Sequence, residues 1–375
     1  MNHFFLAASL IYVAINSYIF IHGWQAVPPI FIYRLIYIIF FMLIFSMFLI
    51  SMGGLNTLPL GILKITYGIG TIWLACIMYF FLFFLFTDIT GLFNHWIHFL
   101  PDNITAHFRQ IQFYGASAII IVLLFYGHHK FSNPSVNTCN ITINKKAGDR
   151  KELKVVGISD IHLGLLIDKK KLSKYVDKIN ALAPDIILIT GDVIDNSVRP
   201  LNAEHIEEEL NRLNAPLGIY MCLGNHEHFS GIENSMNFLK KTKIHLLVDS
   251  VAYVDNSFWI VGRNDKFVGD SRRPLADLIA ETNQTDPVFL LDHQPFHLND
   301  AEKAGVDFQF SGHTHNGQLW PGNLIVKSIY ELGHGYKQKG NFHVYVSSGL
   351  ALWGPLFRIG TESEIVVFNI KFGEQ

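Results

Sequence analysis

Charge is distributed very unevenly along this chain of 375 residues. The first 129 residues carry only five of its 29 basic and 31 acidic side chains, namely Arg34, Lys64, Asp88, Asp102 and Arg109. A soluble domain of that length needs many more polar groups to cover its surface, whereas a lipid-embedded region does not. The sequence therefore predicts a transmembrane region over residues 1–129, followed by a globular region of ordinary charge density.

Four apolar runs in this region are candidates for membrane-spanning helices, namely 4–22, 30–52, 65–87 and 111–127. A helix needs about 20 apolar residues to cross a bilayer, which the second and third runs exceed and the fourth approaches. The first run has an alternative interpretation as a cleaved signal peptide, but it has neither a basic leading segment nor a small-x-small cleavage site. Charged residues are scarce within the runs and form no polar constellation, which favours an anchor over a transporter.

Basic residues near the ends of the spans predict the orientation of the chain, because such residues gather on the cytoplasmic side. With four spans, the N-terminus, the loop after the second span and the globular domain share one side. That side has four basic residues against two on the other, namely Lys64, Lys130, Lys145 and Lys146 against Arg34 and Arg109. The three cysteines show no CxxC spacing, which agrees with a reducing compartment and gives no thiolate zinc site. We therefore expect the globular domain to face the cytoplasm.

From residue 130 onward, short β-branched runs alternate with helical patterns. Residues 130–152 are interpreted as a linker and a first strand, and residues 153–375 as one domain. Strands are expected at Val155–Ser159, Ile186–Thr190, Ile219–Leu223, Val288–Asp292 and Phe308–Phe310, and helices at about 169–183, 203–213 and 232–242. This alternation predicts a layered α/β domain. The net charge of −2 gives no electrostatic footprint for nucleic acid, so no nucleic-acid partner is expected.

Polar side chains follow each of these strands, at the carboxyl ends where α/β sheets bind ligands. The segments are Ser159-Asp160-Ile161-His162, Gly191-Asp192-Val193-Ile194-Asp195, Gly224-Asn225-His226-Glu227, Asp292-His293 and Gly312-His313-Thr314-His315. Residues i and i+2 of an extended chain point the same way, so Asp160 and His162 are expected to face one metal ion together. By the same spacing, His313 and His315 are expected to reach a paired site. Asp192 lies at the centre of the set, and its carboxylate can bridge two cations.

The chemistry of these ligands narrows the kind of site. They offer nitrogen and oxygen but no sulfur, which suits Mn²⁺, Zn²⁺ or Fe and argues against a zinc finger or an iron–sulfur cluster. A pair of such ions clamps a phosphoryl group and lowers the pKa of a shared water, which then attacks phosphorus as a metal-bridged hydroxide. His226 is the remaining candidate to protonate the leaving oxygen, with Asp195 to orient it.

The five segments, in this order, resemble the motifs of the calcineurin-like metallophosphoesterases over about residues 153–371. The run 312–318, the segment 345–350 and Arg358 are similar to the membrane-associated bacterial YkuE/YaeI-like branch. The resemblance implies two mixed β-sheets sandwiched between helices and two divalent ions, with Mn²⁺ the first candidate. It implies a first metal held by Asp160, His162, Asp192 and His315, and a second held by Asp192, Asn225, His293 and His313. It also implies an acid or transition-state role for His226, with Asp195 behind it.

The expected function is that of a phosphoesterase anchored in a bacterial inner membrane, which hydrolyses a phosphate ester or a pyrophosphate. The membrane region favours a lipid-linked substrate, because a tethered active site meets bilayer substrates most often. The resembled branch suggests UDP-2,3-diacylglucosamine, a compound of lipid A biosynthesis. The alternative is a non-catalytic membrane scaffold or sensor that uses the same fold. Such a protein is expected to have lost several ligands, whereas all seven are present together with His226.

Overall fold

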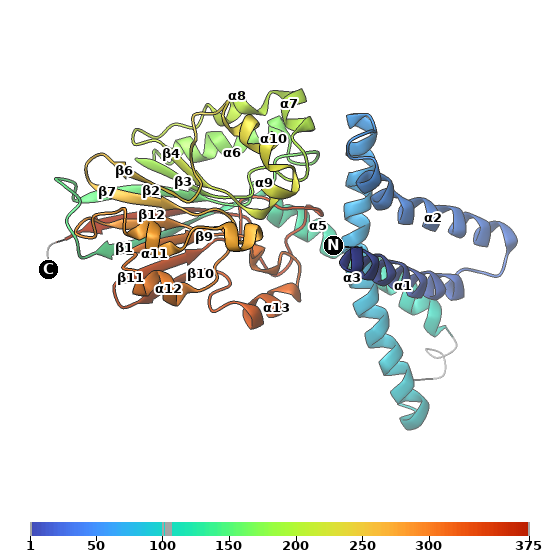
Figure 1. The fold of residues 1–375 in the computed structure, drawn as a ribbon. Coiled ribbons are helices and arrows are strands. Elements are labelled where there is room, and N and C mark those ends of the chain that lie inside the picture. The colour runs from blue at the N-terminus through green and yellow to red at the C-terminus, as the bar shows by residue number, and fades with distance from the viewer. Residues whose placement is uncertain (1, 100, 102–106, 374–375) are drawn as a thin grey trace. The chain divides into compact units, whose positions relative to one another are not determined.

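The computed structural model describes residues 2–99, 101 and 107–373 and divides into two compact units (Figure 1). The first unit is Met1–His128 and the second is His129–Gln375. We describe each unit by itself. The predicted membrane region and domain both include a few residues that lie outside the described part of the chain.

Four long helices make up the described part of the first unit. They are α1 (Asn2–Ala26), α2 (Phe31–Gly53), α3 (Leu60–Ile97) and α5 (Phe108–Ser132), whose last turn belongs to the second unit. All four are long and apolar enough to cross a membrane. At 38 residues, α3 extends beyond the predicted run 65–87 at both ends, to about 57 Å at 1.5 Å per residue. Its length exceeds the hydrocarbon core of a bilayer, which is about 30 Å thick.

A polar network joins three of these helices around Asp88 of α3. The Tyr18 hydroxyl of α1 donates to Asp88 Oδ2 at 2.8 Å, and Arg109 Nη1 of α5 donates to Asp88 Oδ1 at 2.9 Å. His22 Nε2 lies 3.0 Å from Asp88 Oδ2, and Gln112 Nε2 donates to both Asp88 and Thr87. The charged groups of this network, Asp88 and Arg109, lie just outside the apolar runs 65–87 and 111–127, and the apolar runs themselves hold only its uncharged members and His22. Each of the three helices contributes two polar groups, and only the folding of the bundle brings them together.

The second unit consists of two six-stranded mixed sheets with helices on their outer faces (Figure 1). The first sheet has the strand order β1 (Ser135–Ile143), β12 (Glu364–Phe372), β2 (Glu152–Ile158), β3 (Ile186–Thr190), β4 (Ile219–Cys222) and β5 (His245–Leu247). The second has the order β10 (Gly335–Lys339), β11 (Phe342–Val346), β9 (Phe308–Ser311), β8 (Val288–Leu291), β7 (Phe258–Gly262) and β6 (Ser250–Val254). This arrangement confirms the predicted fold class.

Short helices fill the connections between the strands. They are α6 (Lys169–Ala181), α7 (Arg199–Glu204), α8 (Ile206–Leu210), α9 (Asn225–Phe229), α10 (Ile232–Leu239), η1 (Lys266–Ser271), α11 (Leu275–Ile279), α12 (Leu298–Lys303), η2 (His315–Gly317) and α13 (Gly322–Ile329). The single helix expected over 203–213 is wrong. His205 adopts a left-handed conformation with φ of 52°, which separates α7 from α8.

Aromatic and aliphatic side chains fill the space between the sheets. Phe308 of β9 packs its ring against that of Phe368 of β12 at a centroid distance of 4.8 Å, and both side chains are fully buried. All five residues of β3, Ile186–Thr190, are buried because the second sheet covers one face and helices cover the other. The core therefore fixes the parallel strands β2, β3 and β4 side by side, and their carboxyl ends share one edge of the sheet.

Candidate metal centre

The turns that follow β2, β3, β4, β8 and β9 meet at one site and bring together all seven predicted metal ligands. Five of them have left-handed backbone conformations, with φ of 53° at Asp160, 49° at His162, 52° at Asp192, 71° at His313 and 49° at His315. Residues other than glycine rarely adopt this backbone conformation, and the surrounding fold must stabilise those that do. Such backbone turns aim consecutive polar side chains at one point.

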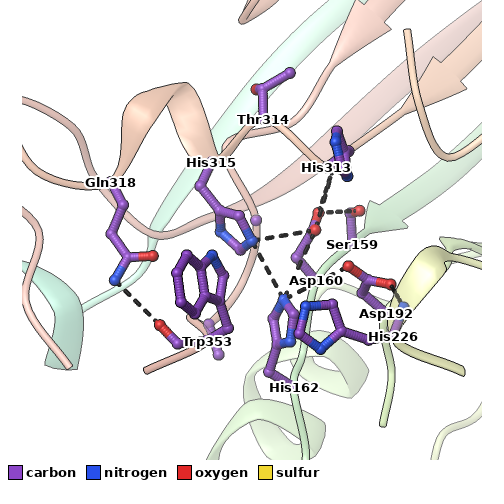
Figure 2. Close-up of polar contacts among 12 residues, drawn as sticks. Ser159, Asp160, His162, Asp192, His226, His313, Thr314, His315, Gln318 and Trp353 are labelled. Atoms are coloured by element: carbon purple, nitrogen blue, oxygen red, sulfur yellow. Dashed lines mark hydrogen bonds and ion pairs between the residues drawn. The ribbon is translucent and has the colours of Figure 1, made fainter. Parts of the chain in front are cut away.

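Asp160, His162 and His315 form the first group of ligand atoms (Figure 2). His315 Nε2 lies 3.3 Å from Asp160 Oδ1 and 3.2 Å from His162 Nε2, and His162 Nε2 lies 3.9 Å from Asp160 Oδ1. All three side chains are nearly or fully buried. One carboxylate and two imidazoles thus converge from β2 and β9 on a single small volume.

Asp192, His293 and His313 form the second group, with Asn225 between them. His293 Nε2 lies 3.1 Å from Asp192 Oδ2. The Asn225 amide oxygen lies 3.2 Å from His293 Nε2 and 2.9 Å from His313 Nδ1. Asp192 Oδ2 is also 3.8 Å from His162 Nε2 of the first group. Asp192 therefore faces both groups, as a bridging ligand must.

The donor chemistry of both groups fits a divalent metal ion. Two imidazole nitrogens 3.2 Å apart, those of His162 and His315, share at most one proton, and neither faces a group that satisfies both. Asp160, His162 and His315 could hold a cation, which would satisfy these acceptors. Nitrogen and oxygen ligands without sulfur suit manganese, zinc or iron.

Burial and neighbouring charges shift the pKa values of the candidate ligands in different directions. Burial works against the charged form of His293, but Asp192 and Asp160 raise its pKa well above the usual range, and burial raises the pKa of Asp160. Burial lowers the pKa of His315, and burial together with His293 lowers that of His313 to about 3, so both imidazoles are neutral. Burial works against the charged form of Asp192, but the nearby His293 and His226 hold its pKa well below the usual range. Neutral imidazoles and an ionised carboxylate are the forms that coordinate metals.

His226 lies beside both groups, and with His162 and Asp195 it forms a third set of side chains whose atoms could hold an ion. Its backbone N–H donates to Asp192 Oδ1 at 2.9 Å, and its Nδ1 lies 3.1 Å from the Asp195 carbonyl oxygen and 3.4 Å from Asp195 Oδ1. Burial alone would lower the pKa of His226, but the charge of Asp192 and hydrogen bonding to Asp195 raise it to about 9. The His226 ring is thus oriented by Asp195, and its raised pKa favours the protonated form.

The sequence did not single out Glu227 for a role, yet this residue organises the Asp192 turn. Its fully buried carboxylate accepts hydrogen bonds from four backbone N–H groups, those of Asp192, Val193, Ile194 and Gly224, at 2.8 to 3.0 Å. Burial and the charge of Asp192 raise its pKa to about 7, while the four donors favour the ionised form. The signal was its place in the Gly-Asn-His-Glu segment.

Arg358 stabilises the His315 turn through hydrogen bonds to backbone carbonyl groups. Its guanidinium is fully buried and donates to the carbonyl oxygens of His315 at 2.9 Å, Ser348 at 2.5 Å, Gly349 at 3.1 Å and Ala351 at 2.9 Å. Burial lowers the pKa of Arg358 to about 10, so it stays charged at neutral pH. A five-donor planar cation suits a cage of carbonyls, which lysine cannot match. Arg358 was predicted only as part of the resemblance, without a role.

Comparison with known proteins decides the family. The family model described as calcineurin-like phosphoesterase matches residues 153–317. An uncharacterized metallophosphoesterase of Campylobacter jejuni is 33% identical over 264 residues, which cover 68% of this chain and 68% of that protein. The chain belongs to the calcineurin-like phosphoesterases. The resemblance predicted from the motifs is thereby confirmed, together with the predicted class of metal-dependent phosphoric ester hydrolase.

Two further relatives of this calcineurin-like phosphoesterase extend the likeness beyond the family domain. A Danio rerio protein named transmembrane protein with metallophosphoesterase domain is 30% identical over 280 residues, 70% of this chain and 63% of that protein. UDP-2,3-diacylglucosamine pyrophosphatase LpxG of Chlamydia trachomatis is 25% identical over 317 residues, 68% of this chain and 94% of that protein. Four apolar helices and a relative with this name support a membrane protein.

Proposed function

We propose that this protein hydrolyses a phosphate ester or pyrophosphate bond of a lipid-linked substrate at a dinuclear metal centre. The observation that carries the proposal is the convergence of seven nitrogen and oxygen ligand atoms into two adjacent groups, with Asp192 Oδ2 3.1 Å from His293 Nε2 of one group and 3.8 Å from His162 Nε2 of the other. A single structural ion would need only one such group. Two adjacent groups with a common carboxylate are suited to in-line displacement at phosphorus.

Each group of ligands would hold one ion. Asp160, His162, Asp192 and His315 would hold the first, and Asp192, Asn225, His293 and His313 the second. When bound, the two ions supply Lewis-acid chemistry, which acidifies a water molecule and neutralises charge on the phosphoryl oxygens. We propose manganese as the resident metal, since three carboxylate and amide side chains accompany the four imidazoles, with zinc or iron as the other candidates.

The protein's own residues then handle the leaving group. His226 would donate its proton to the departing oxygen, a role for which Asp195 orients the imidazole. Asp195 would orient the ring through the contact to Nδ1, which leaves Nε2 free to face the substrate. Glu227 and Arg358 would position the Asp192 and His315 turns.

The apolar surroundings of His226 favour a lipid-linked substrate. The Phe229 ring lies 5.3 Å from that of His226 and 5.1 Å from that of Phe267, and both phenylalanines are more than half exposed. An exposed aromatic pair at a polar site suits a substrate with an apolar portion. The relative named UDP-2,3-diacylglucosamine pyrophosphatase suggests one such lipid, so we propose UDP-2,3-diacylglucosamine as the first substrate to test.

Metal analysis and a substrate screen test this proposal. The full chain, stripped of metal and then reconstituted with Mn²⁺, is expected to bind about two ions per chain. The loaded protein should hydrolyse UDP-2,3-diacylglucosamine faster than chromogenic monoesters and diesters. A single ion, or none, would sink the dinuclear centre. Two ions with no hydrolysis of any ester or pyrophosphate would instead support the scaffold alternative.

We also propose that the catalytic domain faces the cytoplasm of a bacterium, on the basis of the flanking basic residues. Lys240 is exposed in the catalytic domain, so a Lys240→Cys variant offers an accessible thiol. In a background with Cys76 and Cys139 replaced by serine, this thiol should resist an impermeant reagent in intact cells and react after lysis. Labelling in intact cells would place the domain on the other side of the membrane.

A further inference from the structure

Helix α13 of the catalytic domain exposes an apolar face to solvent. Leu324 is 55% exposed, Ile325 60% and Ile329 58%, and Trp320, just before the helix, is 51% exposed. We call these four residues the α13 face. Val326 is the only residue of α13 that is buried. Four large apolar side chains this close together mark an interaction surface, because scattered single ones are the rule on soluble domains.

Close contacts connect helix α13 and its flanking segments to the turn that carries His313 and His315. At its start, Gly317 of η2 lies so close to Gly322 and Asn323 that a Cβ there would meet their backbone at 2.2 Å. At its end, the Thr314 hydroxyl donates to the Gly333 carbonyl oxygen at 2.6 Å, which ties the segment after α13 to the turn between His313 and His315. The Tyr330 ring, next to Ile329, lies 6.5 Å from that of His313. A partner bound to the α13 face would therefore lie next to the turn that carries His313 and His315.

Chain connectivity restricts what can cover this face. The last membrane-spanning helix, α5, ends at Ser132 and β1 begins at Ser135, so only Asn133 and Pro134 lie between them. The three residue steps from Ser132 to Ser135 reach at most about 11 Å. The catalytic domain is thus always held within a short distance of the bilayer, at a higher effective concentration than any free partner.

The composition of the face also fits a bilayer surface. Tryptophan is enriched at the membrane interface, and short helices with leucine and isoleucine on one face insert there. Lys327 is exposed on the same helix, and a lysine at the rim suits anionic headgroups. Trp353, 48% exposed, adds a second tryptophan, and its carbonyl oxygen accepts a hydrogen bond from Gln318 beside His315 (Figure 2).

We propose that the α13 face docks into the interfacial layer of the bilayer that holds the anchor, and so keeps the rim of the metal centre at the lipid headgroups. The docking rests on the membrane anchor and the exposed face, whereas its use for substrate delivery rests on the proposed function. A phosphate or pyrophosphate attached to a lipid lies in this same layer. The site would then reach its substrate without pulling the lipid out of the membrane.

Lipid quenching of a fluorophore on the full chain tests the docking. In a background with Cys76 and Cys139 replaced by serine, Ile325→Cys is labelled with an environment-sensitive dye, and the protein is placed in lipid nanodiscs with or without doxyl-labelled lipid. The matched control is Tyr253→Cys, an exposed apolar position on β6, at the opposite edge of the second sheet from β10. Quenching should be several-fold stronger at position 325 than at position 253.

Equal quenching at the two positions would overturn the proposal. So would weak quenching at position 325 with energy transfer between labelled chains, because a second copy would then cover the face. This measurement needs no turnover, so it remains decisive if the proposed substrate is wrong.

An activity ratio tests the consequence of docking. The double variant Leu324→Glu with Ile325→Glu should lower the rate on a bilayer-embedded phosphate ester several-fold, relative to the rate on a soluble chromogenic ester. Tyr253→Glu should leave that ratio unchanged. Equal loss on both esters in the double variant would mean that α13 serves the centre structurally and would refute delivery from the membrane.

Discussion

The polar cluster around Asp88 and the metal centre around Asp192 differ in how their groups are paired. The Asp88 carboxylate accepts hydrogen bonds from Tyr18, Arg109 and Gln112, so its negative charge meets donors and a positive charge within the protein. Around Asp192 and Asp160, carboxylates and imidazoles converge on one another, and two imidazole nitrogens face each other at 3.2 Å. In the first cluster the charge of Asp88 is paired within the protein, whereas the second cluster offers ligand atoms that cations would pair.

The pairing of polar groups distinguishes a structural polar network from a binding site. Complementary donors and acceptors around a carboxylate stabilise helix packing without a bound ion. Several acceptors aimed at the same point, on turns held in left-handed conformations, cost free energy unless an ion binds there. Removing one group at a time from either cluster tests this contrast.

The largest effect is expected from Asp192→Asn. Both ligand groups lose their shared charge, so the metal content should fall below two ions and kcat/KM should drop by at least about 10⁴-fold. Elemental analysis and a soluble ester assay measure both quantities. Asp255→Asn, which removes an exposed ion-pair partner of Arg150, is the control and should keep both values. Full metal content in Asp192→Asn would contradict the bridging role.

Replacement of His226 by alanine should lower kcat by about 10²–10⁴-fold, because general acid catalysis contributes that much. Both ions should stay bound, since His226 belongs to neither ligand group. The loss should shrink for esters with good leaving groups, which need less protonation. His205→Ala, at an exposed site, serves as the control. Equal losses across leaving groups would rule out proton donation and leave an electrostatic role only.

A smaller effect is expected from Glu227→Gln. The glutamine amide would place its N–H group against two of the four backbone N–H groups from which the carboxylate accepts hydrogen bonds. The Asp192 turn should therefore shift. Outer-shell changes of this kind typically cost about 10–100-fold in metal affinity or activity. Metal titration and a rate assay measure the loss, with exposed Glu233→Gln as the control. Unchanged affinity and rate would show that the turn holds without the carboxylate.

The smallest effect on catalysis is expected from Asp88→Ala. Loss of the network should destabilise the helix bundle by about 1–2 kcal/mol, the range found for interhelical polar contacts in membranes. Thermal unfolding in detergent, followed by tryptophan fluorescence, reports the loss. Ser46→Ala removes a hydroxyl that bonds only within its own turn and is the control. Activity on a soluble ester should not change; a large drop would mean that the Asp88 cluster takes part in function beyond anchoring.

Much of the fold could be predicted because its signals are local. Length and composition are enough to predict the four apolar helices. The carboxyl ends of β2, β3, β4, β8 and β9 are predicted by short apolar runs that are followed by Asp, Asn or His. The break between α7 and α8 could not be predicted, because a helical pattern spans His205 and the left-handed turn there depends on packing around it. The length of α3 was also missed, because its polar residues near the end look like a loop in sequence.

Residue type and spacing along the chain were enough to predict the membrane region, the α/β class and a set of candidate metal ligands. The grouping of these ligands required the folded structure, because the distances between them arise between strands far apart in the chain. The folded structure alone revealed the roles of Glu227 and Arg358, the Asp88 network and the exposed α13 face. Burial and partnership are properties of contacts, and a pattern along one chain does not record which surfaces meet.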